Sequence, residues 1–236
     1  MKLRHAALII ALIVIADQAL KLYVKTHFAY SDEPHKVLGN WFELQFVENA
    51  GMAYGWKFGN DWGKLALTIF RLGAVIFGTW YIARIIKEKQ HRGFIACVAL
   101  VYAGALGNLL DSAFYGMIFD KGMLIDPSNG ANIYYSGVAQ FSKNGYGSFL
   151  HGNVVDMLHL DFFQFKLPKS FPSWLGDDNG TFRFFAPVFN IADASISTGV
   201  IAILVFQKRF FKQRKPKETH HTVETGALVN DESQVS

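Results

Sequence analysis

The sequence has a single cysteine, Cys97, and few charged residues for its length. One cysteine excludes an intramolecular disulfide framework and a zinc cluster built from cysteine ligands. Charged residues make up 18% of the 236 residues, against about 25% in ordinary soluble domains. The chain also lacks the H-E-x-x-H and G-x-S-x-G patterns, so the usual sequence signals of zinc peptidases and serine hydrolases are absent.

Hydrophobic residues, by contrast, reach 51% and gather in long blocks separated by the charges. A helix that spans a bilayer needs about 20 mostly apolar residues. Four blocks satisfy this length, and they cover residues 3–24, 65–86, 94–116 and 188–210. We therefore predict an all-α membrane protein with four transmembrane helices. The first block could instead be a cleaved signal peptide, but no clear small-x-small cleavage site follows it.

The basic residues determine the predicted orientation, since Lys and Arg are enriched in short cytoplasmic segments. Twelve of the 23 gather at the start of the first block, around the link between the second and third, and around the end of the fourth: Lys2, Arg4, Arg84, Lys87, Lys89, Arg92, Lys208, Arg209, Lys212, Arg214, Lys215 and Lys217. Both termini are thus predicted to be cytoplasmic, with outer loops at 25–64 and 117–187. Residues 1–212 form the predicted membrane domain, and the polar residues 213–236 a disordered cytoplasmic tail.

The first outer loop contains an alternating aromatic and β-branched stretch from Trp41 to Val47. Such alternation is typical of strands, here either in a β-rich outer subdomain or in an interfacial hairpin.

Polar residues inside the spans carry the functional signal, because charged groups are costly in a bilayer and mark sites by default. Three pairs lie one helical turn apart: Asp17 with Lys21, Asn108 with Asp111, and Asn190 with Asp193. With the predicted orientation, the three acids lie roughly 7–11 Å below the outer ends of their spans. Three separate segments therefore place carboxylates in one layer near the outer face.

Each of these features also has a purely structural interpretation. Asp17 and Lys21 could form only an intrahelical ion pair. Asn108 and Asn190 could hydrogen-bond between helices, and Gly104 could allow close helix packing. Arg71 could extend toward the interface or pair with an acidic neighbour.

Five stretches, in order along the chain, resemble motifs of the lipoprotein signal peptidase family, bacterial signal peptidase II. Asp17–Lys21 resembles D-x-x-x-K, Asn49–Gly55 resembles N-x-G-A-A-F, Gly104–Asp111 resembles G-G-A-x-G-N-x-x-D, Val154–Asp156 resembles V-V-D, and Phe189–Asp193 resembles F-N-x-A-D. Two departures stand out. Ser112 occupies the position where the family has Arg, so that role is either dropped or taken over, by Arg71 or Arg183. The interval from Asp111 to Asp156 is also longer than in the family, which implies an extra outer loop at 117–150.

The resemblance implies an aspartic endopeptidase that removes the signal peptide from diacylglyceryl-modified prolipoproteins by cutting before the lipidated cysteine. Its catalytic carboxylates would be Asp156 and Asp193, with no metal and no other cofactor. Two facing carboxylates in a poorly solvated site cannot both ionise easily, so one holds a proton while the other activates water. The residues that would bind substrate or shape the site are Asp17, Lys21, Asn49, Gly51, Gly104, Asn108, Asp111 and Asn190.

The same resemblance implies lipidated prolipoproteins and membrane lipids as partners. It places the chain in the bacterial cytoplasmic (inner) membrane, with the active site near the outer face. No nucleic acid partner is expected, and the protein is expected to act as a monomer.

Two other classes of function fit the intramembrane charges. A proton- or ion-coupled transporter would use them as a relay. However, the acids lie near one face, and four spans without inverted repeats are few for transport. A non-catalytic scaffold would use the polar residues only for helix packing.

The predicted topology can be tested with reporter fusions. Fusions after Gly59 and after Ser142 should report an outside location, and fusions after Gln90 and Lys217 an inside location, because the basic clusters mark the inside. An outside signal at Gln90 would contradict the topology.

Overall fold

The computed structural model describes residues 1–39, 41–50, 61–126, 128, 130–161, 164–166, 168, 181–183 and 187–211. Within this part of the chain, four helices are long and apolar enough to cross a membrane. They are α1 (Leu3–His27), α2 (Asp61–Lys87), α3 (Arg92–Leu110) and α5 (Ile191–Phe210). The prediction of an all-α membrane protein with four spans is therefore confirmed. The predicted tail at 213–236 and Gly51 lie outside the described residues.

Several helix ends differ from the sequence prediction, and two of them lie beside functional or buried polar residues. α5 begins at Ile191 rather than Val188, because Asn190 is extended and caps the helix by accepting a hydrogen bond from the backbone N of Asp193. α1 continues past residue 24 to His27. Its last turns stay helical because the ammonium group of Lys25 is buried against a carboxylate of the protein instead of ending the span in water.

α3 is the central helix and packs against α1, α2 and α5. Small residues allow its close approach to α5: a Cβ on Gly104 would lie 2.7 Å from the Ser195 hydroxyl, and one on Gly199 would lie 2.7 Å from the carbonyl oxygen of Cys97. The chain continues from α3 through a π-helix, η1 (Asp111–Tyr115), into the short α4 (Gly116–Ile118). π-helical turns inside α-helices are frequent at functional sites.

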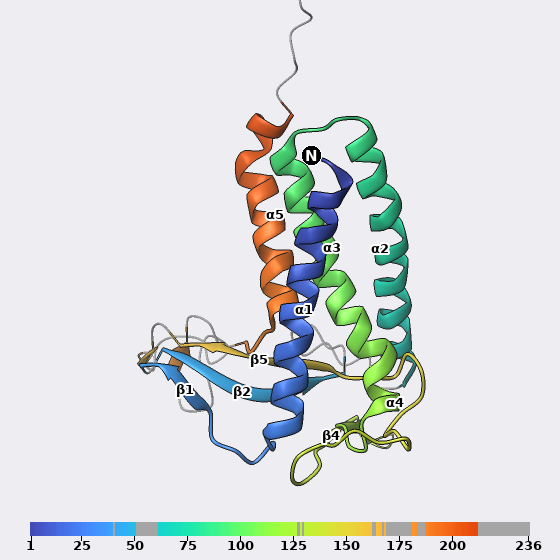
Figure 1. Ribbon diagram of the computed structural model, residues 1–236. Coiled ribbons are helices and arrows are strands. Elements are labelled where there is room, and N and C mark those ends of the chain that lie inside the picture. The colour runs from blue at the N-terminus through green and yellow to red at the C-terminus, as the bar shows by residue number, and fades with distance from the viewer. Residues whose placement is uncertain are drawn as a thin grey trace, which may run out of the picture.

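The N-terminus, the α2–α3 connection and the end of α5 lie together at one end of the bundle, the upper end in Figure 1. The outward surfaces of the helices carry large apolar side chains such as Ile15, Phe70 and Val205. Such surfaces suit contact with lipid rather than water.

A three-stranded antiparallel sheet lies at the opposite end of the bundle (Figure 1). It contains β1 (His35–Leu38), β2 (Phe42–Asn49) and β5 (Val154–Leu160) in the order β1-β2-β5. This confirms the predicted strand from the Trp41–Val47 stretch. Val47 pairs with Asp156 and Glu48 with Val155. Two further hairpins are formed by β3 (Leu124–Ile125) with β4 (Asn132–Ile133), and by β6 (Gln164–Lys166) with β7 (Thr181–Arg183).

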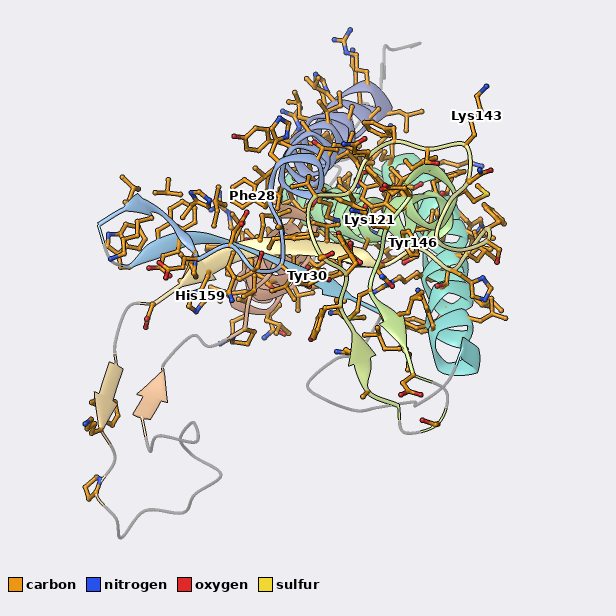
Figure 2. The ribbon with its side chains drawn as sticks, turned by 90° about the horizontal axis from the view of Figure 1, so that it is seen from below. Phe28, Tyr30, Lys121, Lys143, Tyr146 and His159 are labelled. Carbon is orange, nitrogen blue, oxygen red and sulfur yellow. The ribbon has the colours of Figure 1, made fainter. Side chains whose placement is uncertain are left out.

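We call residues 119–153, between α4 and β5, the outer segment. In Figure 2, viewed along the bundle from the sheet end, Lys121 and Tyr146 of this segment lie over the ends of the helices. The outer segment shares a hydrophobic cluster with the end of α1, with η1 and with both long strands: Val24, Phe28, Phe46, Tyr115, Phe119, Ala139, Val155 and Met157. The outer segment is thus packed onto the bundle and the sheet, and it does not form a separate domain.

Candidate active site

The site is organised around the ammonium group of Lys21, which is fully buried in α1. The ammonium Nζ lies 2.8 Å from Asp17 Oδ2 and 2.7 Å from Asp111 Oδ2, and it donates to Asn108 Oδ1 at 2.8 Å. A lysine ammonium has three donors, so these contacts use all of them. The Asp17–Lys21 pair is therefore more than an intrahelical ion pair, because it joins α1 to α3.

Asp17 also fixes the start of α5. Its Oδ1 accepts a hydrogen bond of 2.8 Å from the backbone N of Ala192 in the first turn of that helix. The first N–H groups of a helix have no partner within the helix, and a carboxylate satisfies them well. A Cβ on Gly107 would lie 2.7 Å from Asp17 Oδ2, so the glycine is needed for α1 to approach α3 here.

Two asparagines hold the two proposed catalytic acids. Asn108 Nδ2 donates to Asp193 Oδ1 at 2.8 Å, and Asn190 Nδ2 donates to Asp156 Oδ1 at 2.6 Å. Asn190 Nδ2 also lies 3.1 Å from Asn108 Oδ1, so one chain of amides connects the acids. Asn49 Nδ2 approaches the other oxygen of Asp156 at 3.5 Å. β2, α3, β5 and α5 thus contribute to one site.

The two acids have different surroundings. Asp156 is 4% exposed, and burial together with the negative charge of Asp193 raises the pKa of Asp156 to about 7. Asp193 is less buried and lies in the first turn of α5, where the partial positive charge of a helix start favours a carboxylate. Asp156 therefore holds a proton more readily than an ordinary aspartate, and the two acids differ in their surroundings.

Arg71, one of the two arginines considered for the position beside Ser112, contacts that residue. Arg71 Nη1 donates to Ser112 Oγ at 2.8 Å. The guanidinium also interacts electrostatically with three carboxylates of the site, those of Asp193, Asp111 and Asp156. Arg183 lies in β7, paired with Gln164. α2 therefore brings a guanidinium to the position that the sequence of α3 leaves without one.

Sequence reasoning did not single out Gln18. Its Nε2 donates to Asp111 Oδ1 at 2.7 Å, and its Oε1 accepts from the Tyr115 hydroxyl at 3.2 Å. An uncharged polar side chain next to Asp17 inside an apolar span was a signal, although its partner is 93 residues away along the chain. Gln18 and Lys21 together satisfy Asp111, whose Oδ2 also accepts from the backbone N of Val155.

Of the ten predicted site residues, eight lie in this hydrogen-bonded network: Asp17, Lys21, Asn49, Asn108, Asp111, Asp156, Asn190 and Asp193. Gly104 lies instead at the α3–α5 contact, which agrees with its structural interpretation as a close-packing residue. Within the described residues, no group of three or more His, Cys, Asp or Glu is arranged to hold a metal ion.

The sequence is similar to one family over most of its length. A family model described as Signal peptidase (SPase) II matches residues 9–209. A lipoprotein signal peptidase from Porphyromonas gingivalis is 39% identical over 207 residues, which are 86% of this chain and 82% of that protein. A lipoprotein signal peptidase from Amoebophilus asiaticus is 35% identical over 200 residues, which cover 84% of this chain and 75% of the relative.

Solved structures show the same fold. A bacterial membrane enzyme superimposes with a TM-score of 0.53 and 23% sequence identity, covering 90% of this chain and 93% of its own. A second structure of a bacterial membrane enzyme has the same TM-score and identity over 87% of this chain. These similarities give no support to a transporter.

The central role of Lys21 can be tested by the substitution Lys21→Met. The change leaves Asp17 and Asp111 buried without their cation, which typically costs about 3–5 kcal/mol. We expect a large fall in the unfolding temperature of the detergent-purified protein. The control is Arg84→Gln, which breaks an exposed ion pair on α2 and should leave the unfolding temperature unchanged. Equal unfolding temperatures for Lys21→Met and the unmodified protein would contradict this role.

Proposed function

The chain belongs to the signal peptidase II family, and from this premise we propose that Asp156 and Asp193 are its two catalytic carboxylates. Membership makes the protein a membrane protease that removes the signal peptide from lipoprotein precursors. The observation that carries the assignment of the acids is the amide chain from Asp156 through Asn190 and Asn108 to Asp193. It holds two carboxylates from a strand and a helix in one buried site.

The asymmetry of the pair suggests how the roles divide. Asp156, with its raised pKa, is the proton-bearing acid that polarises the scissile carbonyl. Asp193 is the ionised partner that takes a proton from the attacking water. Asn108 donates to the ionised carboxylate, while Asn190 orients Asp156 and caps the helix that carries Asp193. One asparagine thus sets the relative position of both reacting groups.

The substrate we propose is a prolipoprotein that carries a diacylglyceryl-modified cysteine, cut just before that cysteine. A site at the sheet end of the bundle supports this, since the lipid chains can stay in the bilayer while the peptide bond meets Asp156 and Asp193. Arg71 would help to hold the peptide: a guanidinium has five donors, and among the described residues its hydrogen bond goes to Ser112 alone.

We also propose that the protein lies in the bacterial cytoplasmic membrane with both termini in the cytoplasm. The N-terminus, the α2–α3 connection and the end of α5, where the basic residues cluster, share one end of the bundle, which supports this orientation (Figure 1). We propose that the protein acts as a monomer, which the closure of the described Asp156–Asp193 network within one chain allows.

The proposed acids are tested by Asp156→Asn and Asp193→Asn. Asparagine keeps the shape of the side chain but cannot ionise, so each variant should lose cleavage while remaining folded. Because the two acids act as one unit, the double variant should be hardly worse than either single variant. The measurement is release of the signal fragment from a lipidated precursor, with the membrane level of each variant checked in parallel.

The matched control is Asp161→Asn, one residue beyond β5, which should retain cleavage. Robust cleavage by Asp193→Asn would remove the aspartic assignment. Robust cleavage by Asp156→Asn would move the partner role to another acid.

The pH dependence of kcat/KM tests which acid holds the proton. Activity requires protonated Asp156, so kcat/KM should fall about tenfold per pH unit above pH about 7. The amide of Asn49 favours the ionised form of Asp156, so Asn49→Ala should raise the pKa and move the alkaline limb to higher pH. An alkaline limb that moves to lower pH in Asn49→Ala would contradict the assignment.

A further inference from the structure

A second buried ion pair lies beyond the catalytic network, between Lys25 of α1 and Glu48 of β2. Lys25 is fully buried and Glu48 is 3% exposed. In the part of the chain that the structure describes, neither side chain hydrogen-bonds to Asp156 or Asp193. A buried charge pair costs much desolvation and stabilises little by itself, so its presence calls for a specific role.

The ammonium group of Lys25 sits among aromatic rings. Its Nζ lies 4.9 Å from the ring centre of Phe119, 5.3 Å from that of Tyr146 and 5.5 Å from that of Tyr135. It also donates to the carbonyl oxygen of Lys121 at 3.0 Å. All four partners belong to the outer segment, and cations are attracted to ring faces at these distances. Lys25 therefore binds the outer segment to the end of α1.

Glu48 binds the same segment from the sheet. Its Oε2 accepts from the backbone N of Met123 at 2.7 Å and from Asn153 Nδ2 at 2.8 Å. Its Oε1 accepts from Lys25 Nζ and from the Tyr135 hydroxyl. A carboxylate has about four acceptor positions, and these contacts occupy them all. The start, middle and end of the outer segment thus meet at one carboxylate.

The last of these partners, Asn153, connects the pair to the catalytic strand. Its Nδ2 also donates to the carbonyl oxygen of Met123 at 2.8 Å, and its Oδ1 accepts from Lys64 Nζ of α2 at 2.6 Å. Its backbone N donates to the Tyr146 hydroxyl at 2.8 Å. β5 begins at the next residue, Val154, and Asp156 follows two positions later. The place where β5 starts is therefore fixed by the outer segment.

The β2–β5 pair separates the two networks. Paired residues share a face of a sheet, and successive residues alternate between faces. Glu48 and Val155 lie on the face toward the outer segment, whereas Val47 and Asp156 lie on the face toward Asn190. A shift of Glu48 would therefore move the backbone that carries Asp156 without touching either acid directly.

We propose that Lys25 and Glu48 are positioning residues. They bind the outer segment to the sheet and so keep the carboxylate of Asp156 correctly placed relative to that of Asp193. This inference rests on the catalytic role proposed for Asp156. The outer segment is then part of the catalytic scaffold, and its attachment controls turnover more than substrate affinity.

The test uses the purified full-length protein and a lipidated lipobox peptide. Glu48→Gln leaves the ammonium group of Lys25 buried without a counter-charge. We expect kcat to fall about 10–100-fold, the scale of loss when reacting groups are misplaced by about 1 Å. KM should change by less than about threefold, because the residues that would hold the peptide are not altered. The rate is expressed per folded enzyme, with the folded amount taken from thermal unfolding.

A rescue variant separates positioning from simple loss of contacts. In Lys25→Met with Glu48→Gln no charge is left uncompensated, and the amide oxygen introduced at position 48 can still accept from the backbone N of Met123. Its kcat should exceed that of Glu48→Gln by about fivefold or more, since coupled residues are not additive. The matched control is Glu88→Gln in the exposed Arg84–Glu88 pair, which should leave kcat unchanged.

A kcat for folded Glu48→Gln within about twofold of the unmodified protein would overturn the proposal, as would a change confined to KM. If Glu48→Gln does not accumulate, Tyr135→Phe decides, because it removes one hydrogen bond to Glu48 and keeps the ring beside Lys25. That variant should lower kcat with unchanged KM, and an unchanged kcat would overturn the proposal. Activity in Asp156→Asn would instead refute the assigned acids, so the two failures are distinguishable.

Discussion

The fold depends on keeping a lysine charged inside an apolar bundle. Lys21 can be buried because Asp17 and Asp111 neutralise it and Asn108 takes its third donor. Each partner then acts on something else: Asp17 caps α5, Asp111 accepts from the backbone of β5, and Asn108 binds Asp193. Water is scarce at such a depth, so polar groups that lose one partner find no replacement. The need to satisfy one cation therefore fixes α1, α3, α5 and β5 relative to one another.

The two proposed catalytic acids are held by neutral amides, whereas the surrounding scaffold is held by charged groups. Asn108 and Asn190 bind the two acids without neutralising either of them. A lysine that replaced Asn190 beside Asp156 would favour the ionised form of Asp156, against the proton-bearing role proposed for it. Lys21 acts on Asp156 only through its charge, because all three of its hydrogen-bond donors are used by Asp17, Asp111 and Asn108. The residues that neutralise Lys21 and the acids proposed to transfer protons are thus neighbours in one network but are different residues.

The sequence allowed prediction of those parts that follow from local pattern. Hydropathy predicted four spans, and the depth of Asp17, Asp111 and Asp193 in them predicted a shared layer. Asp156 lies in a strand of an outer loop, where no helical depth can be calculated, so only the family resemblance indicated it. Long-range contacts could not be derived from local pattern either, and Arg71 was only one of two candidates for the position beside Ser112. The approach of Arg71 to Ser112 spans 41 residues and depends on how α2 packs against α3, which no local pattern encodes.

The attachment of the outer segment follows from the same constraint one turn further along α1. Lys25 lies one turn beyond Lys21, so α1 presents two successive ammonium groups that both need buried partners. The first finds its partners in the membrane helices, and the second finds Glu48 and the aromatic rings of the outer segment. Glu48 and Asn49 are neighbours in β2, and Asn153, which donates to Glu48, directly precedes β5. The partners of both lysines therefore involve the same two strands, β2 and β5. The α1 helix is therefore held in place at both Lys21 and Lys25. The sheet that contacts the partners of both lysines is the one that carries Asp156.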